Sequence, residues 1–183
     1  MEQSSPITPG ELRFARSRLS LFVQSEAVAT ANELGFGWRA AAITPSGLDG
    51  LTEELRSCHR SGLPFRVLQD FSENTIFNSA STNWAMRFWH DTRHVWLGAD
   101  FSTEGELQVA SCHLARARTQ GFGRGSLEYA LLLADTVGQT LYLARTKRFV
   151  VQQRQFAIDC VRFDFDTAVE QEIQRSLVEG SAS

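Results

Sequence analysis

Apolar residues recur every three or four positions through most of the second half of the chain, which is the spacing of an amphipathic helix. This spacing predicts one helix from about residue 81 to 97, a second from about 103 to 117, and a third from about 126 to 146. No proline follows Pro64, so no residue in this region breaks a long helix by removing a backbone donor. The pattern favours a mostly α protein.

The remaining segments carry weaker signals. Shorter helices are predicted at 11–24, 26–34 and 51–59. The segment 64–70 reads either as a short strand or as an extended lead-in. The C-terminal part, 150–177, reads as partly helical, although the alternation of apolar and polar residues over 161–165 is typical of a strand. Together these signals predict a single-domain helical bundle over residues 1–183, with flexible ends at 1–10 and 178–183 and at most a short strand element.

Composition narrows the class of protein. The chain has 183 residues, of which 43% are apolar and 21% charged, as in ordinary globular domains. No apolar run reaches the roughly 18 residues of a membrane helix, and no secretory signal is visible, so a cytoplasmic location is expected. Three widely spaced cysteines then indicate free thiols rather than a disulfide framework. The net charge of −3 argues against non-specific binding to nucleic acid.

The densest group of chemically active residues begins at His90. Two histidines four residues apart, His90 and His94, lie one above the other on a helix, so both rings can reach one metal ion. Asp91 can contribute a carboxylate oxygen from the same flank. Gly98 permits a sharp turn, after which Glu106 on an antiparallel helix can return to the same point. Nitrogen and carboxylate ligands suit zinc, iron, manganese or nickel.

Two structural interpretations compete with the metal site. Thr103 and Glu106 have the spacing of a capping box, in which Thr103 would be the N-cap of a helix and Glu106 would return a hydrogen bond to it. Asp91 and Arg87, one helical turn apart, could form an ordinary surface ion pair.

The segment HDTRHVWLGADFSTEGEL resembles the motif of the fourth coenzyme-Q-biosynthesis protein family, which is H-D-x-x-H followed by eleven residues and E. His90, Asp91, His94 and Glu106 occupy its four polar positions in register. The resemblance implies an all-helical fold and a divalent metal, usually zinc, bound by those four residues. It also implies a role in ubiquinone biosynthesis, with an apolar groove for a quinone or prenylated lipid. The lack of a transmembrane segment is compatible with a peripheral membrane contact.

Other polar residues could extend the site. His113 lies two helical turns after Glu106, so it is either a further ligand or partner of the site or simply a packed histidine. Glu128 and Asp135 also lie two helical turns apart. They either add carboxylates to the site or have a capping or solvated role. The aromatic residues around the motif would form core or line a pocket: Trp84, Phe88, Trp89 and Trp96.

The sequence thus supports a metal-binding helical protein and leaves open whether the metal is catalytic. The alternative is a non-enzymatic interaction or regulatory module, with protein partners and a structural metal or none. A weaker third interpretation is nucleic-acid binding through four clustered basic residues: Arg145, Lys147, Arg148 and Arg154.

Overall fold

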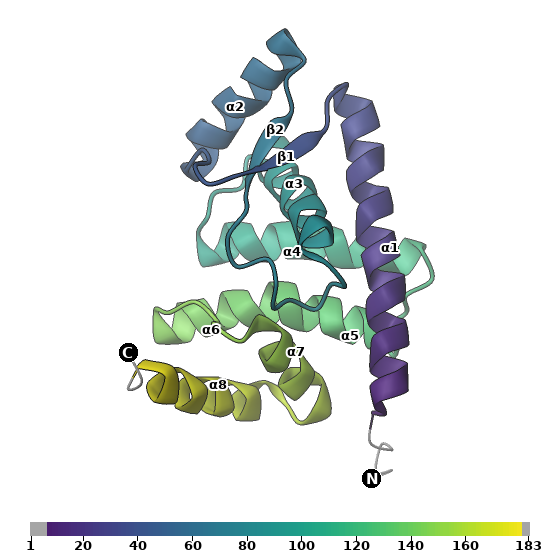
Figure 1. Cartoon of the computed structure of the whole chain (residues 1–183), viewed down its shortest axis with the longest axis vertical. Coiled ribbons are helices and arrows are strands. Elements are labelled where there is room, and N and C mark those ends of the chain that lie inside the picture. Colours follow the sequence, from purple (N-terminus) through teal and green to yellow (C-terminus); the bar gives the residue numbers. More distant parts are fainter. Residues whose placement is uncertain (1–6, 181–183) are drawn as a thin grey trace.

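The computed structural model describes residues 7–180, and helices dominate it (Figure 1). The helices are α1 (Pro9–Leu34), α2 (Gly47–Ser61), α3 (Ala80–Leu97), α4 (Thr103–Thr119), α5 (Leu127–Leu133), α6 (Gln139–Thr146), α7 (Gln153–Arg162) and α8 (Phe165–Gly180). A π-helical stretch, η1 (Ala134–Gly138), joins α5 to α6. Two short strands, β1 (Trp38–Ala41) and β2 (Phe65–Leu68), pair in parallel. The prediction of a mostly α protein is confirmed.

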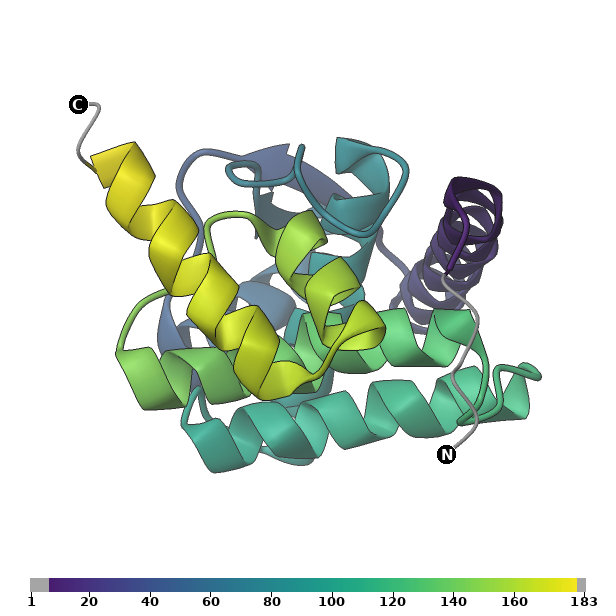
Figure 2. The ribbon, with the colours of Figure 1, turned by 90° about the horizontal axis from the view of Figure 1, so that it is seen from below.

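The helices are arranged in rows. The long helix α1 packs against α3, and the row α5–η1–α6 runs beside α4, as Figures 1 and 2 show from two directions. Helices α7 and α8 pack against each other, and α7 also contacts η1, so this pair covers the side of the row away from α4. Helices α3 and α4, which carry the sequence motif, contact each other, and α4 forms one outer side of the assembly in Figure 2.

Helix α1 differs from the two helices expected over 11–24 and 26–34, because it runs unbroken through residue 25. The hydroxyl of Ser25 donates to the carbonyl oxygen of Phe22, so this polar residue is accommodated inside the helix. Buried residues on both sides of it, Val23 and Ala27, continue one packed face. The helix ends at Gly35, whose φ of 80° is readily adopted by glycine.

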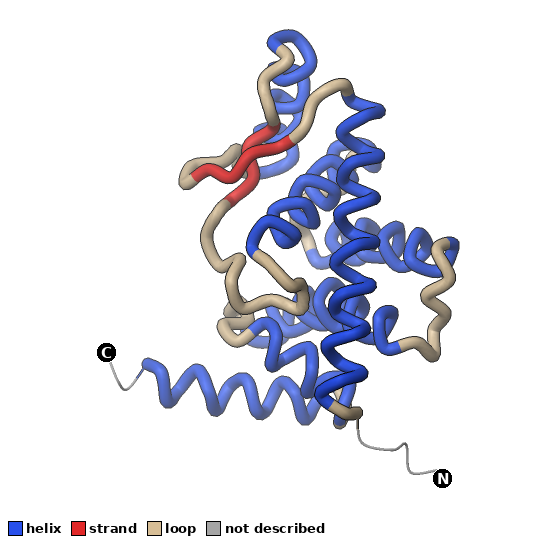
Figure 3. The backbone as a smooth tube through the Cα atoms, turned by 45° about the vertical axis from the view of Figure 1, so that its right-hand side comes forward, coloured by secondary structure: helices blue, strands red, loops and turns tan. Residues whose placement is uncertain are grey.

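Of the two alternatives for residues 64–70, a short strand or an extended lead-in, the structure shows a strand, β2. It also contains a strand that was not expected, β1, which pairs with β2 (Figure 3). Phe65 and Val67 of β2 are fully buried, and Phe65 packs on Phe88 of α3 with 5.8 Å between ring centroids. The alternation at 161–165 does not form a strand: it covers the end of α7 and the start of α8. Phe165 contacts Phe156, whereas Phe163 is exposed, so the alternation reflects two helix ends.

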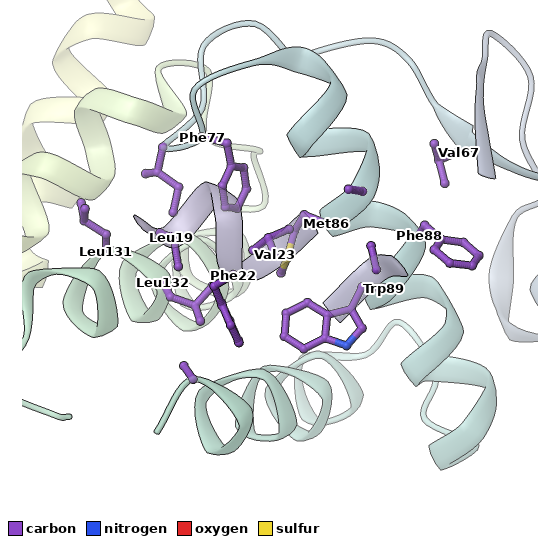
Figure 4. Close-up of a cluster of buried hydrophobic side chains, with 14 of the residues drawn as sticks. Leu19, Phe22, Val23, Val67, Phe77, Met86, Phe88, Trp89, Leu131 and Leu132 are labelled. Carbon is purple, nitrogen blue, oxygen red and sulfur yellow. The ribbon is translucent and has the colours of Figure 1, made fainter. Parts of the chain in front are cut away.

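The main hydrophobic core lies between α1, α3, α4 and α5 (Figure 4). Phe22 of α1 meets Trp89 of α3 edge to face at 5.6 Å between centroids. Phe88 and Trp89 are fully buried, which makes these two members of the aromatic set core residues. A second cluster joins the C-terminal helices and contains Tyr142, Val150, Phe156, Ala168 and Val169.

The two chain ends are only partly described. Pro9 and Gly10, within the segment expected to be flexible, lie in the first turn of α1, and residues 178–180 lie in the last turn of α8. Residues 1–6 and 181–183 of the predicted flexible ends lie outside the described residues. No helix in the described part of the chain is long and apolar enough to span a membrane.

Candidate metal centre

His90, His94 and Glu106 form one compact group, which we call the metal cluster. Within residues 7–180 these three side chains bring one potential ligand atom each to within 4.8 Å of one another. The Nε2 atoms of His90 and His94 are 2.9 Å apart. The carboxylate of Glu106 lies 3.2 Å from Nε2 of His90 and 3.6 Å from Nε2 of His94. Two imidazoles and a carboxylate in this arrangement can hold a metal ion.

The turn between α3 and α4 brings Glu106 over the two histidines. Helix α3 ends at Gly98 in the left-handed conformation, with a φ of 61°. The chain then reverses, and the first turn of α4 packs closely on it at Gly105. A Cβ at Gly105 would collide with the carbonyl oxygen of Asp100. Glycine at this position therefore permits the close approach that places the next residue, Glu106, above the histidines.

The capping-box interpretation of Glu106 is wrong. The N-cap of α4 is Ser102 rather than Thr103, and its hydroxyl accepts from the backbone N–H of Gly105. Glu106 is therefore one residue beyond the position from which a capping-box side chain returns to the cap. Its carboxylate contacts His90 and His94 instead, so the helix start leaves it available as a ligand.

Hydrogen bonding fixes which nitrogen of His94 faces the cluster. The ring is fully buried, and Nδ1 lies 3.0 Å from the carbonyl oxygen of Ala99. Because a carbonyl can only accept, Nδ1 carries the proton and donates it. In the neutral ring Nε2 then presents its lone pair to Nε2 of His90. At 2.9 Å, the space between these nitrogens requires a proton or a metal ion.

His90 has a second partner on α4. Its Nδ1 lies 3.3 Å from Nε2 of His113, whose ring is fully buried against Trp89 with 3.9 Å between centroids. Burial lowers the pKa of His113 well below its ordinary value, so this ring is neutral. Of the alternatives for His113, the structure places it beside His90 rather than in the three-residue metal cluster.

The charges of the metal cluster are interdependent. Burial alone would raise the pKa of Glu106, but hydrogen bonds with His90 and His94 lower it more, to about 2. Burial lowers the pKa of His94, while its hydrogen bonds to Glu106 and Ala99 raise it by more. The carboxylate is thus ionised at neutral pH, which is the form that binds a metal.

Asp91 lies beside the metal cluster and is not part of its three-residue group. Burial raises the pKa of Asp91 to about 6, opposed by the nearby charges of His90 and His94. Among the described residues Asp91 and Arg87 form no salt bridge, although the charge of Arg87 also lowers the pKa of Asp91; Arg87 donates to the backbone carbonyl of Leu68. The role of Asp91 as a ligand remains a prediction.

A pocket of about 370 Å³ opens beside the metal cluster. His90 and Glu106 form part of its wall, and Asp135 and Gln139 face it from η1 and α6. Burial raises the pKa of Asp135 to about 7, although a hydrogen bond from Gln139, 2.8 Å long, lowers it in part. Such π-helical distortions occur frequently at functional sites. The apolar part of the wall comes from Met86, Phe101, Ala110, Leu143 and Phe149.

Sequence reasoning missed most of this pocket. None of the aromatic residues singled out around the motif lines it, and Phe101 and Phe149 supply its aromatic wall instead. The sequence grouped Asp135 with Glu128 by their spacing, but the two have different partners: Glu128 pairs with Arg18 at 2.9 Å, whereas Asp135 accepts from Gln139. No local pattern marks Asp135, because the π-helical turn and the neighbouring helix bring it to the pocket.

The four basic residues near the end of α6 do not form one free patch. Arg145 pairs with Asp166 at 2.6 Å. Arg154 donates to the backbone carbonyls of Thr75 and Glu73. Lys147 and Arg148 are exposed.

Comparisons of this chain with models of protein families, with curated proteins and with solved structures find no match. The interpretation of the site therefore depends on its own geometry and on the motif.

Proposed function

We propose that the protein binds a divalent transition metal, zinc by preference, through Nε2 of His90, Nε2 of His94 and the carboxylate of Glu106. The observation that carries this proposal is the 2.9 Å approach of the two Nε2 atoms. His94 directs a lone pair into this gap because its proton is held by the carbonyl of Ala99. A metal ion between the rings would take the place of the proton that this contact otherwise needs, and would form a bond to each nitrogen.

Three protein ligands favour an accessible metal over a closed structural one. Structural zinc sites are normally closed by four protein ligands, whereas catalytic sites have three and keep one position for water or substrate. His90 and Glu106 are each about a quarter exposed, at 22% and 24%, and both line the pocket. When bound there, such a metal supplies Lewis acidity toward an oxygen of a ligand. In this accessible site Asp91 would be an orienting carboxylate, whereas as a fourth ligand it would close the site and favour a structural metal.

The resemblance to the coenzyme-Q-biosynthesis family supports a quinone or prenylated lipid as the ligand. The pocket volume of about 370 Å³ falls in the range of small-molecule sites and suits a ring-sized head group. At its edge Phe149 is 79% exposed and follows the exposed Lys147 and Arg148. An exposed aromatic beside two cations suits a peripheral membrane contact, along which a prenyl chain would lie.

Elemental analysis tests the metal directly. The wild type, His94→Ala and His59→Ala are purified without a metal-affinity column and measured by ICP-MS. His59 is an exposed histidine of α2 and serves as the matched control. We expect about one metal per chain in the wild type and in His59→Ala, and none in His94→Ala. Equal metal content in all three proteins, or no uptake of added zinc by the wild type, would contradict the proposal.

The second candidate is a non-enzymatic interaction module in which the cluster is held by protons. The 3.2 Å contact between Nε2 of His90 and Glu106 favours it, because a protonated His90 would form an ordinary ion pair there. Absence of metal in the experiment above supports this candidate. If metal is present, chelation separates a structural role from an accessible one, since loss of a structural metal unfolds the protein. We expect the helical circular dichroism to survive chelation.

A further inference from the structure

His113 is a fully buried histidine whose presence the packing of the core does not explain. Its Nδ1 has no hydrogen-bond partner among the described residues, and Nε1 of the adjacent Trp89 has none either. Burying a polar atom without a partner destabilises a fold, so an apolar side chain would pack here at lower cost. The polar contact that His113 does make is the one to Nδ1 of His90, at 3.3 Å.

The direction of this hydrogen bond decides whether His90 can bind a metal. If His113 donates, Nδ1 of His90 accepts, and the proton of the neutral His90 ring lies on Nε2. That proton would point into the metal cluster and occupy the atom that a metal needs. If His90 donates from Nδ1 to Nε2 of His113, its Nε2 lone pair faces the cluster instead.

His113 can accept the hydrogen bond from His90. A neutral imidazole offers one lone pair, and with a metal on Nε2 of His90 the proton of His90 lies on Nδ1 and points at Nε2 of His113. The ring is clamped against Trp89, with 3.9 Å between centroids, which holds Nε2 toward His90. In either tautomer His113 leaves its own Nδ1 unpaired, so the choice between the two directions falls to what occupies the cluster.

We propose that His113 is the positioning residue of the metal centre: it accepts a hydrogen bond from Nδ1 of His90 and thereby keeps Nε2 of His90 free for the metal. This inference rests on the proposed metal binding. The carbonyl oxygen of Ala99 likewise accepts a hydrogen bond from Nδ1 of His94, which leaves Nε2 of His94 free for the metal. Each histidine of the cluster thus has its outer nitrogen engaged by an acceptor, the arrangement by which proteins orient metal-binding imidazoles.

Two amide substitutions separate positioning from packing. His113→Gln places its amide near the position of Nε2, within reach of His90, while His113→Asn places the same amide near Nδ1. Both bury one amide, so their metal-free unfolding in urea should be similar. Zinc affinity is measured by competition with a chromophoric chelator. We expect His113→Gln to stay close to wild type and His113→Asn to bind about 10–100-fold more weakly.

Nuclear magnetic resonance of the wild type gives a readout that does not depend on the variants folding. Long-range proton–nitrogen spectra of the zinc-loaded protein should show the His90 proton on Nδ1 and its Nε2 metal-bound. A His90 proton on Nε2 overturns the inference, as does equal zinc affinity of His113→Gln and His113→Asn. A wild type that binds no zinc rejects the proposed function itself, whereas these two results reject only the role of His113.

Discussion

Two groups of buried polar residues in this protein differ in how many of their hydrogen-bond acceptors are paired with donors. The first is the metal cluster between α3 and α4. The second, which we call the closed cluster, joins α7 and α8 through Asp159, Glu172 and Arg175. In the metal cluster two imidazole nitrogens face each other across 2.9 Å and need a proton or a metal ion between them, whereas the closed cluster pairs each carboxylate with donors.

Glu172 shows what a structural buried charge looks like. Its side chain is fully buried, and one oxygen accepts from the backbone N–H groups of Val151 and Gln152 at 2.8 and 3.0 Å. The other oxygen accepts two hydrogen bonds from Arg175, at 2.9 and 3.0 Å. Donors surround this carboxylate, so it needs no ligand from outside the protein. The closed cluster is complete as it stands, whereas the metal cluster still needs a proton or a metal ion between its two ring nitrogens.

Opening the closed cluster should have the largest effect on stability. Glu172→Ala removes the shared acceptor, so the backbone N–H of Val151 and part of the Arg175 guanidinium lose their partner in the interior. We expect a loss of about 3–5 kcal/mol in the free energy of unfolding, measured in urea, with metal content unchanged. Asp166→Ala is the matched control, because it breaks an exposed pair with Arg145 and should cost less than about 1 kcal/mol. Similar losses in the two variants would remove the distinction between the clusters.

Metal binding should stabilise the protein through the metal cluster alone. At free zinc 100 times the dissociation constant, the gain is about 2.7 kcal/mol, or roughly 5–11 °C in Tm for a domain of this size. We expect this rise in the wild type, measured by thermal unfolding with and without zinc after treatment with chelator. The variant His94→Ala should show no rise. An equal rise in both proteins would place the zinc elsewhere.

A pH-dependent effect should come from Asp135, for which Gln139 is the hydrogen-bond donor in the structure. Its pKa rises from an ordinary value of 3.8 to about 7 through burial, so the folded protein holds a proton there that the unfolded chain has lost. Stability from this group is therefore present at low pH and declines as pH rises from about 4 through 7.

The variant Asp135→Asn tests this sign. In metal-free protein, the Tm of the wild type should fall relative to that of the variant between pH 4.5 and 7.5. A constant difference in Tm across that range would show that Asp135 titrates normally. The comparison is made with chelator present, because a metal bound nearby would add a positive charge.

The local sequence predicted helices around the site more accurately than the connections between them. The helix expected over 81–97 corresponds to α3, and the one expected to start near Thr103 does so in α4. Gly98 ends α3 as expected, because glycine readily adopts the left-handed conformation. Strand β1 and the π-helical stretch were not predicted, since the first depends on pairing with β2 and the second on packing by its neighbours.

The sequence by itself determined that His90 and His94 share a helical face, because residues four apart on a helix are neighbours whatever surrounds them. Only the tertiary structure decided that Glu106 faces both rings, through a close turn permitted at Gly105. It also decided that His113 lies beside His90 and that Asp135 lines the pocket. Helical periodicity is a local property, whereas contacts between side chains of different elements form only when those elements pack together.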